Sequence, residues 1–156
     1  MIGYDGHKKI KGSKIHACVT PDALPVSIAI GPANEHDSRK LIPLMEDIRI
    51  KTGRRPRQRP REMYGDKAYS TFIIRTYLGR RHVKAQIPSR RRKKHRGRPP
   101  RFDKASYKRH RSSVERFFSM LKGGFRRLMV RYERLATAFQ GLINIACFII
   151  NWRVLR

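Results

Sequence analysis

The sequence predicts an α/β domain with a short mixed sheet, flanking helices and a C-terminal helical segment. Before the basic run at 89–101, short apolar runs rich in β-branched residues alternate with runs at helical spacing, the order of a layered α/β fold. After that run, the apolar residues keep helical spacing to the end of the chain. With 156 residues, the chain has the length of one domain with a modest core.

The first elements are a hairpin and a helix. Apolar and β-branched runs at 14–20 and 24–30 flank the turn-forming residues Pro21-Asp22-Ala23, which predicts two antiparallel strands. Asp37 is placed to be the N-cap of a helix, although a proline at position 43 falls in its first turns. The apolar residues of that helix follow at helical spacing: Leu41, Leu44, Met45 and Ile48.

The remaining elements are shorter or further apart. A strand is expected at 62–64, a helix at 71–78 and a strand at 83–87. The run at 89–101 is predicted to be a basic linker or insertion, and helices are predicted at about 104–122 and 134–152. The expected order is therefore β-β-α-β-α-β followed by helices.

The charge of the chain points to a polyanionic partner. There are 38 Lys and Arg residues against 11 Asp and Glu, a formal net charge of +27. The cations are spread over the chain instead of forming one tail, which is typical of a nucleic-acid-binding domain whose affinity falls with salt. Binding to a membrane surface is not favoured, because the basic segments lack a large accompanying apolar face.

Targeting signals and cysteine chemistry add little. The first residues show no charged region followed by an apolar run, so no secretory signal is expected, and the predicted compartment is the cytoplasm, at the nucleoid. The apolar stretch at 136–152 contains three polar amides and is short for a bilayer span, which favours a buried helix or an oligomer contact. Cys18 and Cys147 suggest neither a disulfide framework nor a zinc site.

A single carboxylate lies in a stripe of cations on the first C-terminal helix. Helical geometry places Glu115 close to the meridian of Arg111 and Lys122, beside an apolar stripe. One interpretation is an i,i+4 ion pair between Arg111 and Glu115, worth a few tenths of a kcal/mol. The other is a metal-binding acid surrounded by phosphate-binding cations, and the helix alone leaves both open.

Asp66 is the second acid with two interpretations. It follows the expected strand at 62–64 and the small residue Gly65, a position where α/β enzymes expose an acid. A turn aspartate that caps the helix at 71–78 explains the same pattern. Two carboxylates from different elements can hold hard divalent cations, which prefer oxygen ligands, but such a site needs at least one further acid.

Two basic segments are predicted to contact DNA. Four lysines lie at the entry to the first strand: Lys8, Lys9, Lys11 and Lys14. A solvated strand edge explains them as well, although the net charge favours phosphate contact. Arg96-Gly97-Arg98-Pro99 is similar to a short arm that inserts arginines into the minor groove, or it is a flexible basic linker. His36-Asp37 is interpreted as a histidine beside an N-cap and not as a metal pair.

These motifs together resemble the insertion-sequence transposases of the DDE class, over residues 3–150. The resemblance rests on Gly3-Tyr4-Asp5-Gly6, on Ala33-Asn34-Glu35-His36-Asp37 and on Gly65-Asp66-Lys67-Ala68-Tyr69. It is most specific at the family's Tyr-Arg-Glu-Lys signature, which Arg111, Glu115 and Lys122 fit, while the tyrosine, at 107, lies one residue early. The resemblance implies an incomplete RNase H-like fold, with 1–156 as part of the catalytic domain and 104–156 as its C-terminal helices.

The resemblance also implies the chemistry. Asp66 and Glu115 correspond to the second and third catalytic acids, both ligands of two Mg²⁺ or Mn²⁺ ions, and Arg111 and Lys122 to cations that contact DNA. The implied partners are element ends and target DNA, a second copy of the chain and an upstream fragment, but no membrane. The family's first acid lies on a strand upstream of the first matching motif, and neither Asp5 nor Asp22 fits its motif.

The expected function is therefore that of a transposase fragment. Intact relatives cleave DNA and transfer strands with metal ions, whereas this chain is expected to bind DNA and to cleave it poorly or not at all. The alternative is a non-catalytic nucleic-acid-binding protein or an inhibitor of transposition, which the charge supports equally well. A further alternative is that the chain does not fold stably without the first strand of the family.

Overall fold

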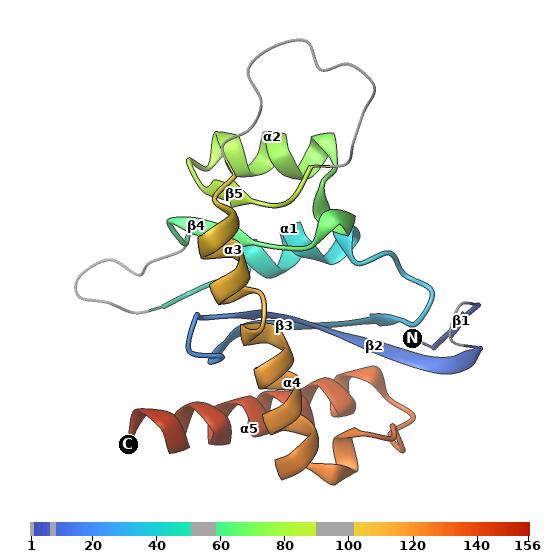
Figure 1. Cartoon of the computed structure of the whole chain (residues 1–156). Coiled ribbons are helices and arrows are strands. Elements are labelled where there is room, and N and C mark those ends of the chain that lie inside the picture. The colour runs from blue at the N-terminus through green and yellow to red at the C-terminus, as the bar shows by residue number, and fades with distance from the viewer. Residues whose placement is uncertain (1, 7–8, 51–58, 90–101) are drawn as a thin grey trace.

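A three-stranded antiparallel sheet with helices on both faces forms the centre of the computed structural model (Figure 1). The structure describes residues 2–6, 9–50, 59–89 and 102–156. Its elements are, in chain order, β1 (Gly3–Asp5), β2 (Ile10–Val19), β3 (Pro25–Pro32), α1 (Ser38–Glu46), β4 (Glu62–Tyr64), the 3₁₀ helix η1 (Lys67–Tyr69), α2 (Phe72–Arg80), β5 (Lys84–Gln86), α3 (Lys104–His110), α4 (Ser113–Gly124), the 3₁₀ helix η2 (Arg126–Leu128) and α5 (Ala136–Leu155).

The predicted hairpin is confirmed as β2 and β3, and both strands are longer than expected. They pair antiparallel from Ser13 opposite Pro32 to Val19 opposite Pro25, with an irregularity between Cys18 and Val19. The turn closes with a hydrogen bond from the Thr20 amide to the Leu24 carbonyl, 2.8 Å long. β1 was not predicted, because three residues are too few for a period-2 pattern; it pairs with the start of β2.

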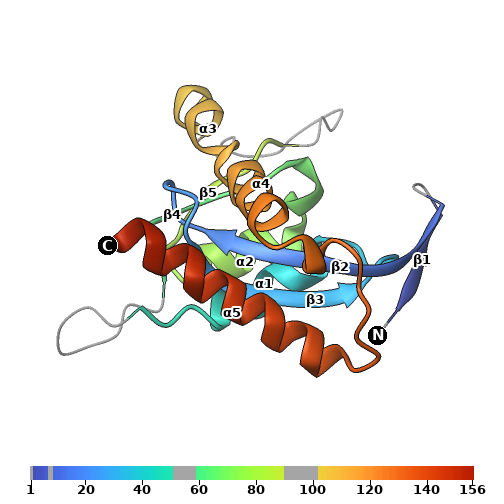
Figure 2. The same ribbon diagram turned by 90° about the horizontal axis from the view of Figure 1, so that it is seen from below.

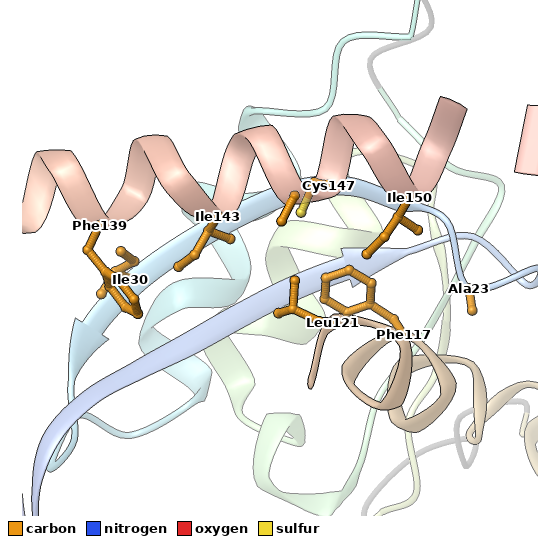
Figure 3. Close-up of a cluster of buried hydrophobic side chains, with 9 residues drawn as sticks. Ala23, Ile30, Phe117, Leu121, Phe139, Ile143, Cys147 and Ile150 are labelled. Atoms are coloured by element: carbon orange, nitrogen blue, oxygen red, sulfur yellow. The ribbon is translucent and has the colours of Figure 1, made fainter. Parts of the chain in front are cut away.

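The larger core lies between the sheet and the C-terminal helices. Figure 2 shows α5 running along β3 and α4 lying over β2, and both pairs of elements are in contact. Buried side chains from the two helices meet Ile30 of β3 and Ala23 of the turn (Figure 3). They are Phe117, Leu121, Phe139, Ile143, Ala146, Cys147 and Ile150. This burial accounts for the apolar residues on the inner face of the stretch at 136–152, as predicted for a buried helix.

A second core lies on the opposite face of the sheet. It is formed mainly by α1, α2 and the residues around β5, and Cys18 and Val26 of the sheet pack against it. Its buried members are Leu41, Met45, Ile48, Ile74, Leu78, Val83 and Ile87. The helices predicted from Asp37 and over 71–78 are thereby confirmed. Asp37 takes the N-cap position of α1 but makes no cap hydrogen bond, because its carboxylate binds Lys14 instead.

The prediction of a single mixed sheet is wrong, because the described strands form two sheets. β4 and β5 are found where expected and pair with each other in parallel, joined by α2. Within the described residues, β2 pairs only with β1 and β3, so neither sheet extends into the other. The α/β class is confirmed. The strands form two sheets because β2 pairs with β3 through the hairpin, whereas β4 pairs with β5 through the α2 crossover.

The helix predicted over 104–122 is in fact two helices. α3 ends at His110 and α4 begins at Ser113. Different partners hold the two parts: Tyr64 of β4 contacts α3, whereas the Pro21 carbonyl accepts hydrogen bonds from Ser113 and Arg116 of α4. The interruption therefore has a tertiary cause that helical periodicity cannot show.

Among the described helices, α5 alone is long and apolar enough to cross a membrane by length and composition. Its inner face nevertheless packs in the core against β3, as the close-up in Figure 3 shows for Phe139, Ile143 and Ile150. A helix that packs in this way is a core element of the domain.

Candidate active site

Asp66 is an exposed acid just beyond the end of β4. Its Oδ1 accepts a hydrogen bond of 2.7 Å from the Ala68 amide and so caps η1. α2 has its own cap, because the Thr71 hydroxyl accepts from the Ile74 amide. The predicted cap of the helix at 71–78 is therefore wrong, and Asp66 caps the unpredicted η1 instead. One carboxylate oxygen is engaged in the cap, and the side chain as a whole stays accessible to a ligand.

Tyr69 connects Asp66 with an acid that the sequence did not place beside it. A Cβ at Gly65 would lie 3.1 Å from the Tyr69 ring, so the glycine permits this close approach. Burial raises the pKa of the Tyr69 hydroxyl, and the charges of Asp37 and Asp66 raise it further. Asp37 comes from the start of α1, and α1 packs against η1, which carries Tyr69. No sequence spacing links these positions, and only the fold reveals their proximity.

Glu115 lies exposed in the first turn of α4. The ion pair with Arg111 predicted from helical spacing is absent: Arg111 belongs to the turn after α3, and no ion pair to Glu115 occurs within the described residues. The helix N-terminus itself favours a negative charge at this position. Glu115 thus remains a free carboxylate in a strongly cationic chain.

Side-chain contacts join α3 to β4 and β5. The Tyr64 hydroxyl lies 2.6 Å from the Ser106 hydroxyl, and the Tyr64 ring lies 4.8 Å from the His110 ring. The Asp103 amide donates to Gln86 of β5, which holds the start of α3. The turn between α3 and α4 is therefore fixed beside the end of β4. The end of β4 is close in sequence to Asp66, and the turn is close in sequence to Glu115.

The two acids considered as substitutes for a first acid lie at opposite ends of β2. Asp22 is exposed in the hairpin turn, next to the Pro21 carbonyl that Ser113 and Arg116 bind, so it lies by the start of α4. Asp5 pairs with Ile10 at the other end of the strand, about 30 Å away at 3.3 Å per residue. Position thus favours Asp22 over Asp5.

The described residues do not by themselves complete a divalent metal site. Asp66 and Glu115 offer the oxygen ligands that Mg²⁺ and Mn²⁺ prefer. In the part of the chain that the structure describes, however, no three His, Cys, Asp or Glu side chains come together to hold a metal ion. His36, which bonds Ser38 at 2.7 Å, is likewise no part of a metal cluster there.

The lysines at the entry to β2 do not all face solvent. Lys9 and Lys11 are exposed. Lys14 is half-buried and donates to the Asp37 carboxylate at 3.0 Å and to the Glu35 carbonyl at 3.1 Å, so its ammonium serves an internal ion pair. Lys8, Arg96 and Arg98 lie outside the described residues.

The turn between α3 and α4 and its neighbouring helices carry a group of exposed cations. Arg111 and Lys122, both predicted, are exposed there. Further exposed cations are Lys104, Lys108, Arg109 and Arg126. No ion pair to any of these cations is found within the described residues. We call Lys104, Lys108, Arg109, Arg111, Lys122 and Arg126 the α3–α4 cation group.

His16 lies buried beside the Lys14–Asp37 ion pair. Its side chain is 4% exposed, its Nδ1 lies 3.9 Å from Asp37 Oδ1, and its Nε2 has no hydrogen-bond partner within the described residues. Nε2 and the Glu35 carboxylate both occupy the space that a Cβ at Gly31 would fill. Burial lowers the pKa of His16, and Asp37 opposes this effect in part. The imidazole is therefore held mainly in its neutral form.

We expect His16 to make the fold less stable in mild acid. In the unfolded chain a histidine titrates near pH 6.5, above the lowered pKa of folded His16, so between these values the unfolded state binds more protons. Its contribution to the free energy of unfolding is complete above about pH 6.5 and falls below it, by at most about 1.4 kcal/mol per pH unit. Urea unfolding at pH 5 to 8 should show a smaller acid loss in His16→Gln than in the parent chain. His36→Gln, at an exposed site, is the control; equal pH profiles for His16→Gln and the parent would contradict the assignment.

Comparison with known proteins agrees with these features. The family model described as "Transposase DDE domain" matches residues 2–152. The chain is 32% identical over 147 residues to the Burkholderia cepacia protein named "Putative transposase for insertion sequence element IS402". That alignment covers 93% of the chain and 65% of the relative. No solved structure matches the chain. The chain belongs to the family of insertion-sequence transposases with a DDE domain.

Proposed function

We propose that the chain binds DNA through the α3–α4 cation group and acts in the transposition of an insertion sequence, with Asp66 and Glu115 as carboxylate ligands of divalent metal ions. The observation that carries the proposal is the exposed Glu115 carboxylate, which lies on the same segment as these cations and has no ion pair within the described residues. A chain with a net charge of +27 offers many cations to each acid, so a carboxylate left free among them is available to another cation.

The cations have a separate role in this proposal. Lysine and arginine side chains along one duplex groove neutralise phosphates, which holds the backbone without reading the sequence. The contact between Tyr64 and His110 keeps the cations of α3 beside β4, so bound DNA passes close to Asp66 as well. The bound DNA is an element end or a target, and the protein acts at the nucleoid.

Strand cleavage and strand transfer are the reactions we propose for the whole protein. The chain spans 65% of the length of its relative, and the described residues lack a third metal ligand. Another segment or an upstream fragment supplies that ligand. By itself the chain is then expected to bind DNA and to leave it uncleaved. Nicking of element-end DNA in Mg²⁺ by the purified chain, lost on Glu115→Gln, would contradict this.

Iron-mediated cleavage of the polypeptide tests the ligands without requiring catalysis. Fe²⁺ in place of Mg²⁺, with ascorbate and peroxide, generates hydroxyl radicals that cut the backbone next to the bound metal. We expect fragments ending near residues 66 and 115, suppressed by excess Mg²⁺ and lost in Asp66→Asn and Glu115→Gln. Glu46→Gln is a matched control, because Glu46 is an exposed carboxylate already bonded to Tyr77 and Arg81.

Nucleic-acid binding without metal chemistry is the second candidate function. It is favoured by the cap that Asp66 makes to η1 and by the absence of a three-donor group within the described residues. In that case Asp66→Asn and Glu115→Gln give the same iron-generated fragments as the parent chain. The DNA affinity of both variants also equals that of the parent chain. Such a result would leave an accessory or inhibitory DNA-binding role.

A further inference from the structure

α5 has a second apolar face that points away from the core. Its inner face is occupied, since Phe139, Ile143 and Ile150 point towards the sheet (Figure 3). The outer face carries large side chains that are mostly exposed: Ile145 at 58%, Phe148 at 65%, Trp152 at 61% and Leu155 at 75%. Phe148 and Trp152 stack on each other with ring centroids 6.2 Å apart. A helix that is apolar on both faces needs a second partner to bury its outer face.

The spacing of the outer face identifies the kind of partner. Residues at 138, 141, 145, 148, 152 and 155 follow one another at alternating steps of three and four, and we call them the outer seam. A strict alternation of this kind is the a/d pattern of helices that pack side by side with knobs in holes. The outer seam can therefore pack against another helix with knobs in holes.

The charge distribution restricts where a second copy of the same chain can dock. Residues 136–152 contain no Asp, Glu, Lys or Arg, although 31% of the whole chain is charged. Two chains of net charge +27 repel each other over most of their surface. Along the outer seam the flanking residues Thr137 and Asn144 are uncharged, so two copies can approach there without bringing like charges into contact.

Side-chain size along the outer seam selects the direction of pairing. The seam begins with the small residues Ala138 and Gly141 and ends with the large residues Trp152 and Leu155. A Cβ added at Gly141 would meet nothing within 4 Å. In an antiparallel pair centred between 145 and 148, Ala138 meets Leu155, Gly141 meets Trp152, and Ile145 meets Phe148 of the other copy. Each layer then combines a smaller with a larger side chain, as close packing requires. A parallel pair instead sets Trp152 against Trp152 and Gly141 against Gly141.

We propose that the outer seam of α5 pairs antiparallel with the outer seam of a second copy of this chain. The contact is isologous, because a two-fold axis through its middle relates equal residues of the two copies. α4 packs with α5 on the same face of the sheet, so each dimer carries two α3–α4 cation groups. The inference rests on α5 alone and holds whether or not Asp66 and Glu115 bind metal.

Sedimentation of the full chain in 1 M NaCl tests the dimer, because at a Debye length of about 3 Å charge repulsion between copies is screened. We expect a concentration-dependent dimer whose dissociation constant rises about 30-fold or more on Phe148→Glu. Phe72→Glu is the matched control: Phe72 is 85% exposed on α2, and its change should leave the dimer intact. Circular dichroism checks that both variants keep their helices. A monomer at about 100 µM, or equal weakening by both variants, would overturn the proposal.

Oxidative cross-linking tests the direction. The double variant Gly141→Cys, Trp152→Cys should form a covalent dimer, whereas Gly141→Cys alone should give no more than the parent chain with its Cys18 and Cys147. Efficient cross-linking by Gly141→Cys alone would indicate parallel pairing and overturn the antiparallel register. Neutral phosphatidylcholine vesicles provide the last arm. A monomeric chain that floats with them, and loses this on Phe148→Glu, would show that the outer seam meets lipid instead.

Discussion

The affinity of the chain for duplex DNA should fall by about 10³- to 10⁵-fold when the salt concentration rises from 50 to 200 mM. This is the loss expected when about six to ten phosphates are neutralised and their counterions are released. The α3–α4 cation group supplies exposed cations without ion-pair partners in the described residues, and Lys9 and Lys11 add to them. Fluorescence anisotropy with a labelled duplex over a salt series measures the slope directly.

Substitutions locate the effect on the surface. Replacing Arg111 and Lys122 together by alanine should weaken binding to any sequence and reduce the salt slope by about two. Arg80→Ala is the matched control, because Arg80 is exposed on α2 and lies outside the α3–α4 cation group. Binding that hardly responds to salt, or that depends on Arg80 as much as on Arg111 and Lys122, would rule out the proposed surface.

Phe117→Ala should lower the free energy of unfolding by about 3–5 kcal/mol, the usual cost of emptying a large buried aromatic site. Phe117 is 0% exposed, lies in the core between the sheet, α4 and α5, and has the Phe118 ring 5.2 Å away. Since single domains are stable by about 5–15 kcal/mol, this loss takes a large share of the total. Urea denaturation followed by circular dichroism measures it.

The control for this change is another phenylalanine outside the core. Phe72→Ala removes the same atoms at a site that is 85% exposed, and it should change stability by about 0.5 kcal/mol or less. If the two variants lost similar stability, α4 would not be anchored through Phe117 as the structure indicates. The assignment of α4 as the helix that positions Glu115 would then lose its basis.

Local patterns predicted most elements. The hairpin, α1, α2, α5 and the short strands β4 and β5 occur where apolar periodicity and turn residues placed them. The break between α3 and α4 could not be predicted, because it depends on Tyr64 holding one helix and Pro21 holding the other. The division into two sheets was missed for the same reason: strand partners are a non-local property, and period-2 patterns say nothing about them.

The candidate site shows a similar division. The positions of Asp66 after β4 and of Glu115 between Arg111 and Lys122 were visible in the sequence, and their spacing led to the transposase family. The engagement of Lys14 by Asp37 was not visible, because the two residues are 23 positions apart and meet only when α1 packs over β2. Lys14 therefore changed from an expected DNA contact to an internal ion pair.

The sequence by itself determined the α/β class, the family and the cationic character, since each depends on residue type and local spacing. The tertiary structure alone decided which carboxylates stay free. The break between α3 and α4 separates Arg111 from Glu115, and Glu115 has no ion pair among the residues that the structure describes. Asp37 is neutralised because Lys14 reaches it across the fold. The physical reason is that charge pairing depends on distances of a few ångströms between atoms, which distant segments acquire only when they pack together.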